Sequence, residues 1–149
     1  MKELKIYFTS DLHGYVYPTD YTERSEKNIG LLNIINEFNK DGNTLIIDAG
    51  DTIQGSPFTN YLSSSEFDLH PIAAIMNAGG YDFITLGNHD FNYGKEYLKK
   101  YLNNLNATCL CANVIDIFSM FSGRSHLLIK SVVNPSKPIF NPFSIVLIL

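Results

Sequence analysis

The sequence predicts an α/β fold in which strands alternate with helices around a largely parallel, buried sheet. Two observations support this class. Short apolar runs rich in β-branched and aromatic residues recur along the chain, and the segments between them repeat their apolar residues at helical spacing. The chain has 149 residues, 45% hydrophobic and 17% charged, which is the composition of one globular domain with a substantial core.

Each predicted strand is an apolar run that stops at polar residues or glycine. The runs are LKIYFT (4–9), TLIIDAGD (44–51), YDFITLGNHD (81–90) and ATCLCANV (107–114). Nearly continuous apolar runs are typical of parallel strands, because helices cover both faces of such a sheet. We therefore expect four buried strands.

Three segments have the spacing and the end residues of helices: 25–42, 71–80 and 94–105. Ser25 is the expected N-cap of the first segment. Pro71 suits the first turn of the second, and the glycine pair ending at Gly80 suits its end. Residues 54–67 contain serines and a proline without an apolar period, so we expect a loop there.

Charge and composition exclude several classes of partner. The net charge is -4 and the lysines are scattered, which argues against binding of a nucleic-acid polymer. The N-terminal residues MKELKIYFTSDLHG turn polar after a short apolar run, so they predict neither a secretory signal nor a membrane span. We expect a cytoplasmic protein that does not bind membranes.

Polar side chains follow three of the predicted strands at the point where each ends. They are Asp11 and His13 after the first strand, Asp51 after the second, and Asn88, His89 and Asp90 after the third. Ligands of open parallel sheets gather outside the carboxyl ends of the strands, so these groups are expected to converge. Carboxylate, imidazole and amide donors without sulfur suit Mn, Zn, Fe or Mg.

The spacing suggests a role for each group. Asp51 follows a glycine that lets the backbone come close, which suits a carboxylate bridging two metal ions. Asp11 and His13 lie two apart on a segment expected to be extended, so both side chains would face one ion. Asn88 could offer its carbonyl oxygen to a second ion, leaving His89 for the substrate. Asp-x-His alone fits a strand-end turn about as well as a metal site, and Gly-Asp alone is a weaker signal still. Asn-His-Asp alone also fits a tight turn or a helix cap, whereas the order of all three at consecutive strand ends favours the metal site.

Four other residues are less informative. Cys109 and Cys111 lie too awkwardly for a mutual disulfide, and we expect partly buried thiols rather than a zinc site. His70 precedes Pro71 and is expected in an exposed loop or a cap. His126 is expected in a solvated loop.

The motifs SDLHG, DAGDTIQGSP and ITLGNHDF resemble the first three signatures of the calcineurin-like metallophosphoesterases. More narrowly, they resemble the family of 5'-nucleotidases, UDP-sugar hydrolases and 2',3'-cyclic phosphodiesterases. The resemblance implies a β-sandwich flanked by helices, in four layers α-β-β-α, of which this chain would form a part. It also implies two divalent metal ions, with Asp11 and His13 on one, Asp51 bridging, and Asn88 on the other.

The resemblance further implies in-line attack on phosphorus by a metal-activated water. His89 would contact the phosphoryl group, and Asp90 would orient and charge its imidazole. The family takes further histidine ligands from later strand ends, including a Gly-His-x-His motif that does not occur before Leu149. We therefore expect residues 1–114 to be the N-terminal part of a catalytic domain and residues 115–149 to be an altered or truncated segment.

Three functions remain open at the level of the sequence, of which the last two are not catalytic. The first is a 5'-nucleotidase-type hydrolase in nucleotide catabolism, acting on a nucleotide or another small phosphoester. The second, the alternative, is a catalytically inactive fragment that binds a divalent metal weakly or obtains missing ligands from a partner chain. The third is an interaction module. The oligomeric state is not predicted.

Overall fold

The computed structural model describes residues 3–23, 25–111 and 114. One parallel sheet with the order β1-β2-β3-β4 is formed by β1 (Lys5–Thr9), β2 (Thr44–Asp48), β3 (Phe83–Ile84) and β4 (Thr108–Cys109). The helices are α1 (Leu31–Asn36), α2 (Pro57–Ser63), α3 (Pro71–Gly79) and α4 (Lys95–Asn104), with the short 3-10 helix η1 (His89–Phe91). The α/β class is confirmed. The segment 115–149, with His126, lies outside the described residues.

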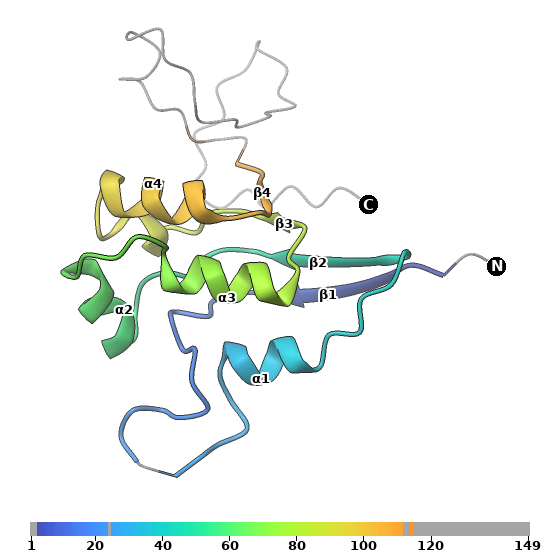
Figure 1. Ribbon diagram of the computed structural model, residues 1–149, viewed down its shortest axis with the longest axis horizontal. Coiled ribbons are helices and arrows are strands. Elements are labelled where there is room, and N and C mark those ends of the chain that lie inside the picture. The colour runs from blue at the N-terminus through green and yellow to red at the C-terminus, as the bar shows by residue number, and fades with distance from the viewer. Residues whose placement is uncertain (1–2, 24, 112–113, 115–149) are drawn as a thin grey trace, which may run out of the picture.

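The register brings the carboxyl ends of the strands to one edge of the sheet. Thr9 at the end of β1 pairs with Asp48 at the end of β2, and Asp48 pairs in turn with Ile84 of β3. Figure 1 shows the strands side by side with the connecting helices in front of them. The loops that follow β1, β2 and β3 therefore leave the sheet at the same edge.

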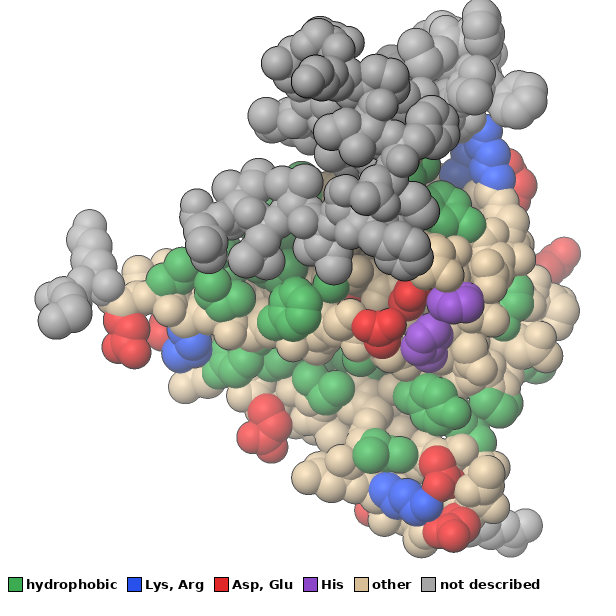
Figure 2. All heavy atoms as spheres, turned by 180° about the vertical axis from the view of Figure 1, so that it is seen from behind, with side chains coloured by type: hydrophobic (Ala, Val, Ile, Leu, Met, Phe, Trp, Pro, Cys, Tyr) green, Lys and Arg blue, Asp and Glu red, His purple; other side chains and the backbone are tan. Residues whose placement is uncertain are grey.

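The described helices pack on one face of the sheet. Ile46 and Ile84 point into the core formed with these helices and are 0% and 2% exposed. Ile6 and Phe8 point the other way and are 54% and 61% exposed. Burial of both faces was expected, but successive side chains of a strand point to opposite faces and only one face is covered by described elements. Apolar side chains consequently lie along the opposite face in Figure 2.

Helix α1 begins later than the sequence predicted. Its first residue is Leu31, with Gly30 at the N-cap, so the prediction of Ser25 as the N-cap is wrong. The first backbone N–H groups of the helix donate to the chain after β1: Leu31 to the Tyr15 carbonyl at 2.9 Å and Leu32 to the Val16 carbonyl at 3.0 Å. These distant carbonyls satisfy the helix terminus in place of a side-chain cap.

Helix α2 lies where a loop was expected. Ser56 is its N-cap, and the Ser56 hydroxyl accepts a hydrogen bond from the Thr59 N–H at 3.2 Å. Pro57 occupies the first turn, where its missing N–H has no cost. The Ser-Pro pair was therefore a helix start, although the segment has no clear apolar period. The Pro71 start and the Gly80 end of α3 are confirmed, with Gly80 in the left-handed conformation.

Candidate metal centre

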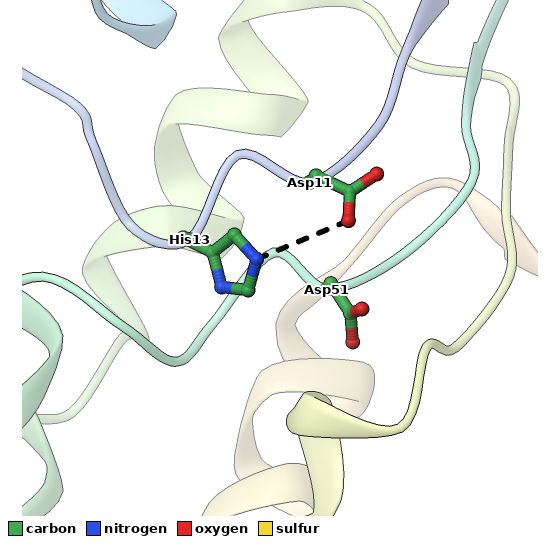
Figure 3. Close-up of side chains that lie close together, drawn as sticks. All are labelled: Asp11, His13 and Asp51. Atoms are coloured by element: carbon green, nitrogen blue, oxygen red, sulfur yellow. Dashed lines mark ion pairs between the residues drawn. The ribbon is translucent and has the colours of Figure 1, made fainter.

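Three predicted ligands from two loops form one cluster. Asp11 and His13 follow β1, Asp51 follows β2, and one ligand atom from each lies within 4.8 Å of the others. Figure 3 shows the imidazole of His13 turned toward Asp11, with the carboxylate of Asp51 beside them. The Nε2 atom of His13 is 3.9 Å from Oδ1 of Asp11. The parallel sheet thus brings together groups that lie 40 residues apart in the chain.

All three cluster residues have left-handed backbone conformations. Their φ angles are 54° for Asp11, 46° for His13 and 56° for Asp51, and the only other described non-glycine residue with positive φ is Tyr21. The extended segment expected around Asp11 and His13 is therefore wrong, although the two side chains do meet. Such conformations cost on the order of 1–3 kcal/mol each and persist where surrounding contacts hold them, commonly at functional sites.

Backbone hydrogen bonds tie the two ligand-bearing loops together. The Asp11 N–H donates to the Gly50 carbonyl at 3.0 Å, and the His13 N–H donates to the Asp51 carbonyl at 2.8 Å. Each bond joins a residue of the first loop to a residue of the second. The two left-handed turns therefore support each other directly.

His13 is oriented as a metal-ligating histidine. Its Nδ1 lies 2.8 Å from the backbone carbonyl oxygen of Gln54. A carbonyl can only accept, so Nδ1 carries the proton, and the lone pair of the neutral ring is on Nε2, the atom that faces Asp11. A hydrogen bond from the other ring nitrogen to a backbone carbonyl is the usual support of a metal-ligating histidine. The donor set therefore fits a divalent ion.

Two glycines allow the Asp51 loop to approach the loop after β3. Gly50 has a φ of 93°, and a Cβ placed on it would lie 2.3 Å from the backbone nitrogen of Gly87. A Cβ on Gly87 would lie 2.2 Å from Oδ1 of Asp51. The same Oδ1 accepts a hydrogen bond from the His89 N–H at 2.7 Å. This bears out the expectation that glycine before Asp51 permits close approach of the backbone.

Asp90 binds the backbone of the Asp51 loop. Its carboxylate is 1% exposed and accepts hydrogen bonds from four backbone N–H groups, at distances of 2.8–3.0 Å. The donors are Asp51, Thr52, Ile53 and Gly87. Burial raises the pKa of Asp90, and the four N–H groups act in the opposite direction. Asp90 therefore holds the shape of the loop that presents Asp51.

The side chain that contacts the His89 ring nitrogen is that of Asn92, whereas the family resemblance had implied Asp90. The Nδ2 atom of Asn92 lies 3.1 Å from Nδ1 of His89. The difference follows from the 3-10 helix η1, in which residues three apart share a face, whereas the adjacent Asp90 points into the interior. The spacing from His89 to Asn92 was the available sequence signal, but it could be used only once a helical turn was known.

Besides Asp90, the predicted site residues fall into three groups. Asp11, His13 and Asp51 cluster; the ring of His89 lies beside the cluster, 5.3 Å from that of His13. Asn88 is exposed and immediately precedes η1, and its role as a ligand stays a prediction. Figure 2 shows histidine and acidic side chains next to one another at the surface.

His70 lies away from this site, at the N-cap position of α3, which is one of its two expected places, although its side chain makes no capping hydrogen bond. The expected exposed loop is wrong. His70 is 0% exposed, and its ring packs edge-on against the rings of Phe67, Tyr97 and Tyr101. Cys109 is half-buried and Cys111 is buried, and neither forms a disulfide, as expected. Among the described residues, no helix is long and apolar enough to cross a membrane.

Comparison with known proteins places the chain in an established family. The calcineurin-like phosphoesterase family matches residues 4–143. A 2',3'-cyclic-nucleotide 2'-phosphodiesterase/3'-nucleotidase of Yersinia enterocolitica is 32% identical over 97% of this chain and 21% of its own length. An NAD 5'-nucleotidase of Haemophilus influenzae is 36% identical over 76% of this chain and 20% of its own.

Solved structures give the same result for the fold. The crystal structure of the calcineurin-like phosphoesterase YfkN from Bacillus subtilis superimposes with a TM-score of 0.65 and 33% identity, over 74% of this chain and 36% of that one. The chain spans about a fifth of the length of the Yersinia enterocolitica and Haemophilus influenzae relatives. With its strand-end motifs gathered around Asp11, His13 and Asp51, the chain belongs to the calcineurin-like phosphoesterase family.

Proposed function

We propose that the protein hydrolyses a phosphoester of a nucleotide, or of another small phosphorylated molecule, with divalent metal ions held at the Asp11, His13 and Asp51 cluster. The observation that supports this most directly is the convergence of these three groups beside His89. The nucleotidase and phosphodiesterase names of the relatives support the substrate class. The bridging role of Asp51 and the ligand role of Asn88 are parts of this proposal.

The chain's own groups suit the handling of a phosphoryl group. A divalent ion would withdraw electrons from a phosphoryl oxygen and lower the pKa of an attacking water. Because Asn92 donates to Nδ1 of His89 in the observed arrangement, the neutral ring carries its proton on Nε2. That N–H can donate to a phosphoryl oxygen or to the oxygen that leaves. Asp90 contributes by fixing the loop of Asp51.

The test is metal binding combined with hydrolysis. The purified chain would be freed of metal with EDTA and titrated with Mn²⁺ by calorimetry, then assayed with a nucleoside monophosphate, a 2',3'-cyclic nucleotide and an aryl phosphate. We expect Mn²⁺ binding and turnover that requires His89, tested with His89→Asn. The exposed Asp68→Asn is a matched control that should keep both properties.

The outcomes separate the candidate functions. Binding of Mn²⁺ without turnover of any substrate would contradict the hydrolase and favour the metal-binding alternative. Failure to bind Mn²⁺ would overturn the hydrolase and the metal-binding fragment, and would leave the interaction module. Turnover by His89→Asn equal to that of the wild type would show that the activity arises elsewhere. The cytoplasmic location stays a prediction.

A further inference from the structure

A second buried carboxylate lies beneath the candidate metal centre. Asp48 ends β2, three residues before Asp51, and is 1% exposed. Its Oδ2 accepts a hydrogen bond from the Thr9 hydroxyl at 2.6 Å, and its Oδ1 accepts from the Thr52 hydroxyl at 2.6 Å and the Gly50 N–H at 3.0 Å. One side chain therefore contacts both strand ends that lead to the metal cluster.

The bond to Thr9 fixes the end of β1. Thr9 is the last residue of β1, lies opposite Asp48 in the sheet, and precedes Asp11 by two residues. Its hydroxyl also lies 3.0 Å from the hydroxyl of Tyr81, which is 5% exposed. The Thr9 side chain is thus held from two sides in the interior. The starting point of the loop that carries Asp11 and His13 is fixed relative to β2.

The bonds to Gly50 and Thr52 fix the turn around Asp51. Gly50 and Asp51 both have positive φ, so neither continues the strand. The Gly50 N–H donates to Asp48, and the next three N–H groups along the chain donate to Asp90. Two buried carboxylates therefore accept every backbone N–H from residue 50 to residue 53. They fix the backbone from which the Asp51 side chain projects.

We propose that Asp48 is a positioning residue of the metal centre, which sets the separation of the Asp11 and Asp51 carboxylates by binding the ends of β1 and β2 with one side chain. The inference rests on the proposed function, because it concerns the same ions. A carboxylate suits this task because each of its two oxygens can accept more than one hydrogen bond. Burial without such partners would be strongly unfavourable for a charged group.

The electrostatics agree with this arrangement. Burial raises the pKa of Asp48 to about 6, and the bonds from Thr52, Thr9 and Gly50 oppose the rise. At neutral pH the group is therefore mainly ionised and can accept all three. Asparagine at this position would keep one carbonyl oxygen for Gly50 and Thr52 and could donate from its amide to the Thr9 hydroxyl.

The experiment compares Mn²⁺ affinity with stability in four variants of the full chain. They are Thr9→Val, Asp48→Ala, Asp48→Asn and the control Thr44→Val. Thr44 is also a buried threonine, but it lies at the opposite end of β2, where its hydroxyl donates to Asp41 at 2.8 Å. Calorimetry would give the Mn²⁺ dissociation constant, and urea unfolding in EDTA would give the stability of the metal-free chain.

We expect Thr9→Val and Asp48→Ala to weaken Mn²⁺ binding by about tenfold to hundredfold, the usual effect of losing a group that supports metal ligands. Asp48→Asn should recover part of the affinity. Thr44→Val should lose stability yet bind Mn²⁺ as the wild type does. If Asp48 acted on Mn²⁺ affinity only through the stability of the fold, Thr44→Val would lose affinity as well. If Asp48→Ala does not fold, Thr9→Val decides the question.

Two results would overturn the inference. One is wild-type Mn²⁺ affinity in Thr9→Val, whatever a folded Asp48→Ala does. The other is an equal loss of affinity in Thr44→Val, because the effect would then follow general stability. If the wild-type chain binds no Mn²⁺, the proposed function fails and the inference fails with it. Binding by the wild type with no effect of Thr9→Val overturns the inference alone.

Discussion

The side-chain amide of Asn92 contacts the imidazole of His89, with Nδ2 of Asn92 lying 3.1 Å from Nδ1 of His89. His89 is the first residue of the 3-10 helix η1 and Asn92 directly follows its end, so the two side chains lie on the same face. An amide nitrogen can only donate, so this contact fixes the ring proton on the opposite nitrogen, Nε2. The ring itself lies 5.3 Å from that of His13.

Asn92→Ala should therefore slow hydrolysis without weakening metal binding. Loss of the amide would free the ring to rotate and to change tautomer, and we expect kcat for an aryl phosphate to fall by about tenfold, less than the loss of a catalytic acid itself. Steady-state kinetics and Mn²⁺ calorimetry would measure the two effects. Asn36→Ala, at the exposed end of α1, is the matched control. An unchanged kcat in Asn92→Ala would contradict the role.

Asp51→Asn should remove most of the metal affinity while preserving the loop. The remaining carbonyl oxygen can still accept the His89 N–H that Asp51 Oδ1 accepts at 2.7 Å. The negative charge that attracts a divalent cation is lost. Calorimetric titration with Mn²⁺ would measure the affinity, and circular dichroism would verify the fold. Retention of wild-type affinity would show that the ion binds without Asp51.

Gly87→Ala should weaken metal binding through steric displacement. The added Cβ would lie 2.2 Å from Oδ1 and 2.7 Å from the backbone nitrogen of Asp51, so the Asp51 loop must move. We expect Mn²⁺ affinity to fall by about tenfold and stability by about 1–3 kcal/mol, as for other overpacked sites. Gly42→Ala is the control, because its Cβ would meet no atom within 4 Å. Equal behaviour of the two variants would contradict the close approach.

His70 should make the fold sensitive to acid. Burial lowers the pKa of His70 to about 4 from an ordinary 6.5, and the charge of Lys100 acts in the same direction. The folded state therefore favours the neutral ring. Its contribution to stability is complete above pH 6.5 and is lost as the pH falls through about 4, a change of about 3 kcal/mol.

The variant His70→Phe would isolate this effect. Neither ring nitrogen of His70 has a hydrogen-bond partner among the described residues, so an apolar ring should be tolerated within the contacts to Phe67, Tyr97 and Tyr101. Urea unfolding at pH 7, 5.5 and 4.5 would compare the chains. We expect the wild type to lose stability relative to His70→Phe as the pH falls from 7 to 4.5. Parallel pH profiles would show that His70 does not control acid stability.

Local sequence determined the class of the fold and the chemistry of the site. Apolar runs separated by helical segments predicted the parallel strands, because both patterns depend on residues a few positions apart. Asp11, His13 and Asp51 could be assigned to one site, because parallel strands bring their carboxyl ends to one edge. The helix α2 was missed, since a seven-residue helix shows little periodicity and only Ser56 and Pro57 marked its start.

Tertiary structure decided how these groups are held. The left-handed turns at Asp11, His13 and Asp51 depend on hydrogen bonds between loops, which no local pattern encodes. The Asp90 side chain points into the interior because its carboxylate accepts from four backbone N–H groups. Three of these groups lie 37–39 residues away in the chain, and only that of Gly87 is nearby. Asp48 could not be distinguished in the sequence from the other polar residues at strand ends. Its contacts with Thr9 and Thr52 exist only when β1 and β2 lie side by side in register.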